Sequence, residues 1–301
     1  GVMHACGHDA HVAILLGVAE VLAGMREELP GTVKFIFQPA EEGPPQGEEG
    51  GASLMVKEGV LDNPKVDAIF GLHVTSRYAV GEIAYRPEGM MAAVDSFKIT
   101  VRGRQTHGAY PWLGVDPIVV AAQIVLGLQT IPSRQLDSTL APSVVTVGAI
   151  HGGVRNNIIP DEVEMIGTIR SLDAKMRDDI HARIRRTVEN IAASAGATAE
   201  VRITTGYPIT YNDPALTESI LPALRRSGAN VKLVHAVLGA EDFSFFQKNV
   251  PGVFYWLGTR PASQTPEEAP SNHSPLFFLD ESGLTLGVRS MAMVAVEYLG
   301  K

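Results

Sequence analysis

The chain has 301 residues, of which 45% are hydrophobic and 19% charged, a composition typical of a globular protein long enough for two domains. A formal net charge of -8 argues against a nucleic-acid-binding protein, which needs a basic surface. No apolar run is long enough for a membrane span, no basic segment precedes the first apolar run as in a signal peptide, and a single cysteine excludes an internal disulfide. We therefore expect a cytoplasmic protein.

The stretch 3–11 contains three histidines, one cysteine and one aspartate. Cys6 and His8 could bind one metal ion through sulfur and nitrogen. Taken alone, Cys6 fits a small buried apolar residue better, and His11 fits a residue at a helix start. The role of His4 stays open.

Residues 12–25 follow directly and predict a helix. Apolar side chains occur on all its sides, so we expect the helix to be well covered by other parts of the fold. Because Gly1 stands so close to the histidine-rich stretch, we also expect that an N-terminal segment is missing.

Two adjacent carboxylates, Glu41 and Glu42, follow a predicted strand. Residues 32–37 are mostly β-branched or aromatic, and Pro39 and Gly43 end the strand. In open α/β sheets, ligands bind where strands end. Neighbouring side chains diverge, so one glutamate could bind a cation while the other stays free as a base. A solvated acidic turn is the alternative.

The next elements continue an α/β pattern. Residues 48–59 predict a short helix, 66–73 a strand with His73 at its end, and 82–85 another strand, with a turn beginning at Gly89. A histidine at a strand end is as often a packed residue as a metal ligand.

From residue 94 the pattern changes to alternating, half-exposed strands. Asp116 followed by proline predicts the N-cap of a helix that runs to about residue 130, and Asp173 opens a charged amphipathic helix that runs to residue 195. Strands are predicted at 94–101, 143–150, 163–171 and 199–205. The order β-α-β-β-α-β predicts an inserted ferredoxin-like domain.

The α/β alternation resumes after residue 208. The sequence predicts helices at 214–226, 243–246 and 282–299, and strands at 231–235 and 252–257. Residues 259–274 form a long loop, and loops of this length in compact domains are often functional. The loop contains Asn272-His273-Ser274, which matches a glycosylation acceptor that a cytosolic protein would not use.

Eight motifs in order carry a family resemblance over essentially the whole chain. They are Met3-His4-Ala5-Cys6-Gly7-His8-Asp9, Gln38-Pro39-Ala40-Glu41-Glu42-Gly43, Gly71-Leu72-His73, Gly103-Arg104-Gln105-Thr106-His107-Gly108-Ala109, Asn157-Ile158-Ile159-Pro160, Gly167-Thr168-Ile169-Arg170, Gly239-Ala240-Glu241-Asp242-Phe243 and Asn272-His273-Ser274-Pro275. The chain resembles the M20 metallopeptidases, and within them the amidohydrolases that act on N-acyl-amino acids, hippurate and auxin conjugates.

The resemblance implies an α/β catalytic domain, residues 1–93 and 208–301, with a central mixed sheet flanked by helices. It implies two divalent metal ions bound by Cys6, His8, Glu42, His73 and His273. Glu41 would be the general base that takes a proton from water, and the resulting hydroxide would be held between the metals. Zinc suits these ligands, while manganese, nickel and cobalt remain open.

The inserted domain, residues 94–207, would be a lid that joins two subunits as a homodimer. His107 would reach the active site of the partner and stabilise the developing oxyanion, while Asn157 and Arg170 would hold the substrate carboxylate. Without the resemblance, His107 fits a turn histidine, Asn157 a turn cap and Arg170 a surface residue. Glu241 and Asp242 could orient a ligand imidazole.

The remaining histidines receive structural interpretations. These are His151, His181 and His235, with His181 placed on an exposed charged helix.

The function expected from the resemblance is hydrolysis of the amide bond of an N-acyl-amino acid. Two alternatives stay open: a dipeptidase or carboxypeptidase of the same fold, and a catalytically silent metal-binding or dimerisation module. We expect small-molecule or short-peptide substrates and neither nucleic-acid nor membrane partners.

Overall fold

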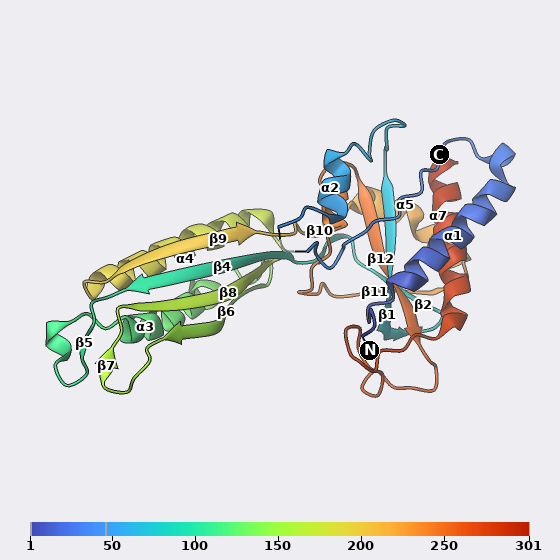
Figure 1. Ribbon diagram of the computed structural model, residues 1–301. Helices are drawn as coiled ribbons and strands as arrows, with labels where there is room; N and C mark the ends of the chain where they lie inside the picture. The colour runs from blue at the N-terminus through green and yellow to red at the C-terminus, as the bar shows by residue number, and fades with distance from the viewer. Residues whose placement is uncertain (1, 46, 301) are drawn as a thin grey trace. The chain divides into compact units, whose positions relative to one another are not determined.

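The computed structural model describes residues 2–45 and 47–300, which form two compact units (Figure 1). The first unit comprises Gly1–Met90, Thr210–Ala236 and Asp242–Lys301, and the second comprises Met91–Ile209 and Val237–Glu241. Among the described residues, no helix has the length and apolar character needed to cross a membrane.

A mixed four-stranded sheet forms the centre of the first unit, in the order β1 (Ile69–Ala79), β12 (Gly252–Arg260), β2 (Glu82–Tyr85) and β11 (Asn230–Leu233). β1 is parallel to β12, β2 is antiparallel to β12, and β11 is parallel to β2. The strand predicted at 82–85 is confirmed, and the strands predicted at 66–73, 231–235 and 252–257 are present with different ends. Because β1 continues to Ala79, His73 lies inside this strand, and its predicted position at the strand end is wrong.

Three long helices pack with this sheet: α1 (His8–Gly24), α5 (Pro214–Arg226) and α7 (Leu284–Leu299). Shorter elements are η1 (Arg26–Glu28), α2 (Gly51–Lys57), α6 (Ser244–Gln247), η4 (Glu281–Gly283) and a two-stranded sheet of β3 (Glu88–Met91) with β10 (Thr210–Asn212).

The helix α1 buries only one face, so the expectation that it is well covered on all sides of its apolar sequence is wrong. Its buried residues recur every four positions: Ala10, Ile14, Val18 and Leu22. On other faces, the exposed fraction is 47% for Val12 and 57% for Leu16. Apolar sequence around a helix therefore does not report how many neighbours cover it.

Two local predictions in the first unit are wrong. Residues 32–37 form no regular strand, because no described strand pairs with them through backbone hydrogen bonds. The segment is held instead by Lys34 Nζ, which donates to the carbonyl oxygens of Val60 at 2.9 Å and Asp62 at 2.6 Å. Gly89 lies inside β3 rather than beginning a turn.

The second unit contains an antiparallel sheet in the order β6 (Ser143–Gly152), β8 (Glu162–Ser171), β4 (Ala93–Arg102) and β9 (Thr198–Thr205). The helices α3 (Pro117–Thr130) and α4 (Ala174–Ser194) lie against one face of the sheet (Figure 1). Between them and the sheet lies an apolar core that includes Ile99, Val101, Ile124, Leu128, Met165, Ile180 and Ile184. The small elements are β5 (Thr106–His107), β7 (Ile158–Ile159), η2 (Pro111–Leu113) and η3 (Ile131–Gln135).

Both predicted helix caps in this unit are confirmed. Asp116 Oδ1 accepts from the backbone N–H of Ile118 at 2.9 Å, and Asp173 Oδ1 accepts from that of Met176 at 2.7 Å. Each carboxylate binds a backbone donor that the first turn of a helix leaves without a partner.

A buried ion cluster links β4 to α4. The Asp95 side chain is 1% exposed, and it accepts hydrogen bonds from Arg177, from His181 Nε2 at 2.6 Å and from the Gly206 N–H at 3.0 Å. Burial alone would raise the pKa of Asp95, but these hydrogen bonds outweigh burial and lower it. His181 is therefore a partly buried hydrogen-bond partner of the sheet, and its predicted position as an exposed residue of a charged helix is wrong.

We predict that Asp95→Asn lowers the free energy of unfolding by about 3–5 kcal/mol at neutral pH, because it leaves the Arg177 charge buried without its partner. The folded-state pKa of Asp95 is depressed, so its stabilisation is present above the unfolded pKa of about 3.9 and is lost as the pH falls through the lower folded value. Urea unfolding at a series of pH values measures both effects. Glu200→Gln on β9, which breaks an exposed pair with Arg202, is the control and should leave the midpoint almost unchanged.

Candidate metal centre

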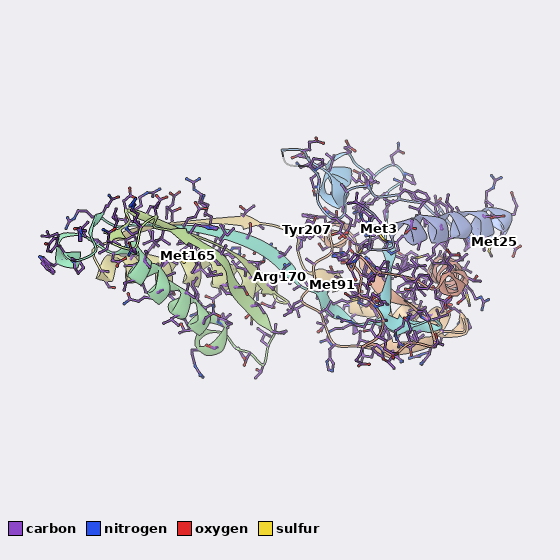
Figure 2. The ribbon with its side chains drawn as sticks, turned by 60° about the horizontal axis from the view of Figure 1, so that its bottom comes forward. Met3, Met25, Met91, Met165, Arg170 and Tyr207 are labelled. Carbon is purple, nitrogen blue, oxygen red and sulfur yellow. The ribbon has the colours of Figure 1, made fainter. Side chains whose placement is uncertain are left out.

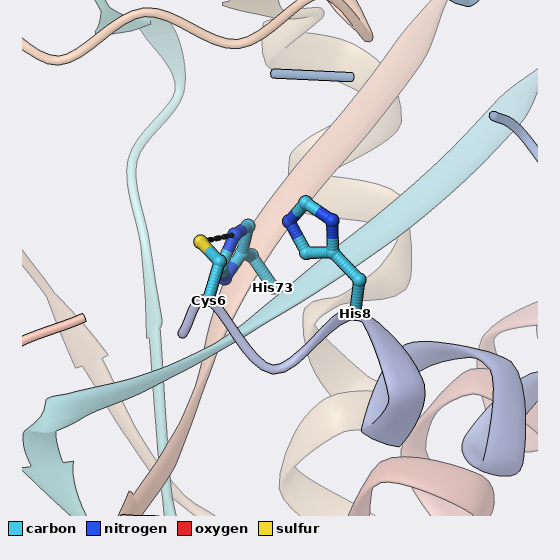
Figure 3. A group of neighbouring side chains, drawn as sticks. All are labelled: Cys6, His8 and His73. Carbon is cyan, nitrogen blue, oxygen red and sulfur yellow. Dashed lines mark hydrogen bonds between the residues drawn. The ribbon is translucent and has the colours of Figure 1, made fainter. Parts of the chain in front are cut away.

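The candidate ligands come from four separate segments of the first unit. Cys6 and His8 flank the start of α1, Glu41 and Glu42 lie in a turn, His73 lies on β1, and His273 lies in the loop after β12. Cys6, His8 and His73 have ligand atoms within 4.8 Å of one another (Figure 3). The ligand atoms of Cys6, Glu42 and His273 meet the same criterion. The five ligands expected from the sequence therefore converge, and Cys6 belongs to both groups.

Short contacts join the members of these two groups. Cys6 Sγ lies 3.4 Å from His73 Nε2 and 3.1 Å from His273 Nε2. His273 Nε2 lies 2.8 Å from Glu42 Oε1. Glu41 contacts another candidate ligand, with its Oε2 3.6 Å from His8 Nε2.

The protonation of His73 suits a metal ligand. Its Nδ1 lies 2.7 Å from the Val74 carbonyl oxygen, and because a carbonyl only accepts, Nδ1 carries the proton. Nε2, which faces Cys6, then has a free lone pair. Burial lowers the pKa of His73 to about 4, so the ring is neutral at pH 7, the form that binds metals.

The thiol and the carboxylates supply the charge that a cation would balance. Burial raises the pKa of Cys6 to about 12, and the negative charge of Glu42 contributes to the rise. A divalent cation beside the sulfur would reverse this effect and hold the thiolate. One sulfur, three imidazoles and a carboxylate fit a borderline-soft cation such as zinc.

Glu41 differs from Glu42 in its surroundings. Its side chain is 18% exposed, against 42% for Glu42. Burial, together with the charges of Glu42 and Asp242, raises the pKa of Glu41 to about 7. A carboxyl group with such a pKa can exchange a proton near neutral pH.

Asp242 organises the turn that carries the two glutamates. Its Oδ1 accepts from Gln38 Nε2 at 2.5 Å, and its Oδ2 accepts from the Ala52 N–H at 2.8 Å. The carboxylate therefore ties together the two ends of the segment between Gln38 and α2. The sequence pointed to Asp242 through its motif, with an imidazole rather than this segment as the expected partner.

The backbone around the centre is conformationally unusual. Gly7 has φ = 88°, a left-handed conformation that glycine adopts without strain. Ala40 and His273 also have positive φ, 55° and 70°, which non-glycine residues rarely adopt. Such positions cluster where the surrounding structure fixes a functional geometry.

His107, Asn157 and Arg170 belong to the second unit, whereas the candidate ligands belong to the first. His107 and Asn157 are neighbours, since the Gly108 N–H donates to the Asn157 carbonyl oxygen at 2.8 Å. His107 is exposed, and its Nδ1 accepts from the Ala109 N–H at 3.0 Å, which leaves the proton on Nε2.

Arg170 does not lie beside His107 and Asn157 within this unit. It pairs with Val94 at the start of β4, whereas Glu162, five residues after Asn157, pairs with Arg102 at the far end of β4. Eight residues of strand separate Arg170 from Glu162, about 26 Å. In Figure 2, Arg170 lies closer than Met165 to Met91, which precedes β4.

Comparison with known proteins identifies the family. The chain matches the family described as Peptidase family M20/M25/M40 over residues 1–296. The chain belongs to this family. It is therefore a metal-dependent hydrolase that acts on amide bonds.

Three relatives illustrate the range of this M20 family. Thermostable carboxypeptidase 2 of Saccharolobus solfataricus is 42% identical, over 100% of this chain and 75% of its own length. N-acetylcysteine deacetylase of Bacillus subtilis is 38% identical, over 98% and 74%. The structure of the Bacillus subtilis YxeP protein, a dinuclear metal-binding peptidase of the M20 family, has a TM-score of 0.82 at 36% identity, covering 99% of this chain and 74% of that one. The expected resemblance to the M20 amidohydrolases is confirmed.

We predict that Gly7→Ala destabilises the protein around the candidate metal centre by more than the backbone strain of an alanine at positive φ would alone. A Cβ at Gly7 would lie 2.4 Å from Val74 Cγ2, next to His73, and the side chain would also strain a positive φ. Thermal unfolding and metal affinity of the variant should both decrease.

Two glycines serve as controls for this variant. Gly196 has φ = 74°, and a Cβ added there would meet no atom within 4 Å, so Gly196→Ala reports the strain alone, about 1–2 kcal/mol. Gly24→Ala adds neither strain nor a clash. If Gly7→Ala is no more damaging than Gly196→Ala, the close packing of Gly7 on Val74 is not important.

Proposed function

We propose that the chain hydrolyses the amide bond of N-acyl-amino acids and releases a carboxylic acid and an amino acid. The observation that carries the proposal is the convergence of Cys6, His8, Glu42, His73 and His273, with Glu41 beside them. The similarity to an N-acetylcysteine deacetylase supports an N-acyl substrate. The single cysteine as a metal ligand also suits a reducing compartment, and we propose the cytoplasm.

The ligand set supports two divalent ions, one on each side of Cys6. His8 and His73 would hold one with the sulfur, and Glu42 and His273 would hold the other. Similarity to a dinuclear metal-binding peptidase supports the same count. When bound, such a pair lowers the pKa of water and polarises the substrate carbonyl. Zinc fits the sulfur and nitrogen ligands, and manganese, nickel or cobalt are the alternatives.

Glu41 is the proposed general base. It stands beside the ligands at 3.6 Å from His8, and its raised pKa suits proton exchange near pH 7. It would take a proton from the attacking water and deliver it to the nitrogen of the amine as the carbon–nitrogen bond breaks. The oxygen of the water then completes the carboxylic acid, so atoms and protons balance.

The second unit is the proposed inserted lid and dimerisation domain, with ferredoxin-like topology. Its strand and helix order and the sheet order β6-β8-β4-β9 support this assignment. His107 would donate its Nε2 proton to the oxyanion in the active site of a partner copy, an exposed donor being suited to that task. Asn157 and Arg170 would bind the substrate carboxylate, Arg170 through a bidentate contact. Because Arg170 lies far along the unit from His107 and Asn157, the three would act in one site only through two copies of the chain.

A carboxypeptidase or dipeptidase is the second candidate. The specific observation in its favour is the 42% identity to a thermostable carboxypeptidase. A substrate panel that compares N-acetyl-amino acids and a hippurate-like amide with dipeptides and longer peptides separates the two. Higher kcat/KM for peptides would favour this candidate, and two bound metals with no hydrolysis of any amide would favour a silent module.

We predict that Glu41→Gln reduces kcat by about 10²–10⁴-fold while two metals stay bound, because the amide keeps the shape of the side chain but cannot accept the proton. Turnover with saturating metal and metal content by elemental analysis are the two measurements. Glu42→Gln is the matched control and should lose metal instead. Near-normal turnover by metal-saturated Glu41→Gln would contradict the base assignment.

We predict that His107→Ala reduces kcat by about 10²–10³-fold, the usual cost of losing an oxyanion donor. Mixing it with Glu41→Gln, under conditions where subunits exchange, should restore activity, since mixed dimers contain one site with both residues. Mixtures that stay as inactive as the separate variants, despite verified exchange, would argue that His107 acts within its own chain or not at all.

A further inference from the structure

The side chain of Asn272 joins two segments that carry candidate ligands. Its Nδ2 lies 3.0 Å from the Cys6 carbonyl oxygen and 3.1 Å from the Val74 carbonyl oxygen. Because carbonyl oxygens only accept, the amide nitrogen must face them, and Oδ1 then faces the Ser76 N–H at 3.4 Å. One amide group therefore connects the loop of Cys6 to strand β1.

The backbone of Val74 takes part in three of these contacts, one through its N–H and two through its carbonyl oxygen. Its carbonyl oxygen accepts from both Asn272 Nδ2 and His73 Nδ1, the latter at 2.7 Å. Its N–H donates to His11 Nε2 at 3.0 Å. The same oxygen that sets the tautomer of His73 is thus held in place by Asn272, and His11 binds the preceding peptide group, which joins His73 to Val74.

Asn272 is also covalently attached to a third ligand, His273. The His273 N–H donates to the Ala5 carbonyl oxygen at 2.7 Å, and its φ of 70° places the imidazole against Cys6 and Glu42. The backbone of His273 and the side chain of Asn272 therefore bind consecutive carbonyls, of Ala5 and Cys6. This double attachment fixes the loop after β12 to the loop before α1.

We propose that Asn272 is a positioning residue of the metal centre, which sets the separation of Cys6, His73 and His273 by binding the Cys6 and Val74 carbonyls with one amide. The inference rests on the proposed ligand set. Residues that orient metal ligands typically contribute about 10–100-fold to metal affinity when tested by mutation. We expect a loss of that size, about 10–100-fold, when the amide donor is removed.

The test compares variants of the full chain by competition for Zn²⁺ against a chelator of known affinity. Asn272→Asp keeps the shape but replaces the donor with an oxygen that repels both carbonyls, and Asn272→Ala removes the group altogether. Asn249→Asp is the matched control, because Asn249 is exposed and its Nδ2 also donates to a backbone carbonyl, that of Phe245. Loading with Co²⁺ adds a second readout, the thiolate-to-cobalt charge-transfer absorption that reports the bond to Cys6.

The expected result is weaker Zn²⁺ binding and an altered charge-transfer band in both Asn272 variants, with Asn249→Asp unchanged. Wild-type affinity and an unaltered band in Asn272→Ala would overturn the inference, even if the unfolding temperature of the metal-free protein falls, because the role would then be structural only. Should Asn272→Asp fail to fold, Asn272→Ala and an Asn272→Ser variant decide the outcome.

Cys6→Ala separates this inference from the proposed function. If Cys6→Ala weakens Zn²⁺ binding and the Asn272 variants do not, only the positioning role fails. If Cys6→Ala binds Zn²⁺ as tightly as the wild type, the proposed ligand set itself fails.

Discussion

The site depends on the position of one buried sulfur atom. Cys6 Sγ is the ligand atom common to both candidate groups, within 3.4 Å of His73 and 3.1 Å of His273. Burial and neighbouring carboxylates oppose ionisation of this thiol, so the arrangement makes chemical sense with positive charge beside it. The hydrogen bonds near this sulfur fix the backbone of Cys6, through Asn272, and the imidazole of His73, through the Val74 carbonyl oxygen.

The first unit supplies a rigid frame for this sulfur. Gly7 permits the turn between Cys6 and α1, and strand β1, paired with β12, carries His73 to within 3.4 Å of the Cys6 sulfur. Asp242 fixes the segment of the two glutamates from a separate part of the chain. The candidate ligands thus lie at the start of a helix, within a strand or on loops whose backbone is tied down by hydrogen bonds, as precise metal geometry requires.

Much of the fold could be predicted from local signals. The helix starts at Asp116 and Asp173 could be predicted because an N-cap side chain binds backbone donors only two or three residues away. Residues 32–37 misled because β-branched composition favours a strand only where a partner strand exists. The sequence also could not predict which faces of α1 are exposed, since the burial of a helix face depends on which other elements pack against it.

The site shows the same division between local and distant information. The candidate ligands could be named from ordered motifs, although their convergence depends on contacts between residues as distant in sequence as Cys6 and His273, 267 residues apart. Asn272 was noticed only as part of a motif, because its two carbonyl partners have no sequence signature. The ion cluster of Asp95 could not be predicted either, since Arg177 and His181 lie 82 and 86 residues away from it.

Anomalous X-ray diffraction from crystals of the zinc-loaded protein, recorded on both sides of the zinc absorption edge, tests the central claim most directly. The account predicts two anomalous peaks that flank Cys6 Sγ, one beside His8 and His73 and the other beside Glu42 and His273, with Glu41 bound to neither. Peaks elsewhere in the chain, or a fully loaded protein in which no metal contacts the sulfur, would contradict it.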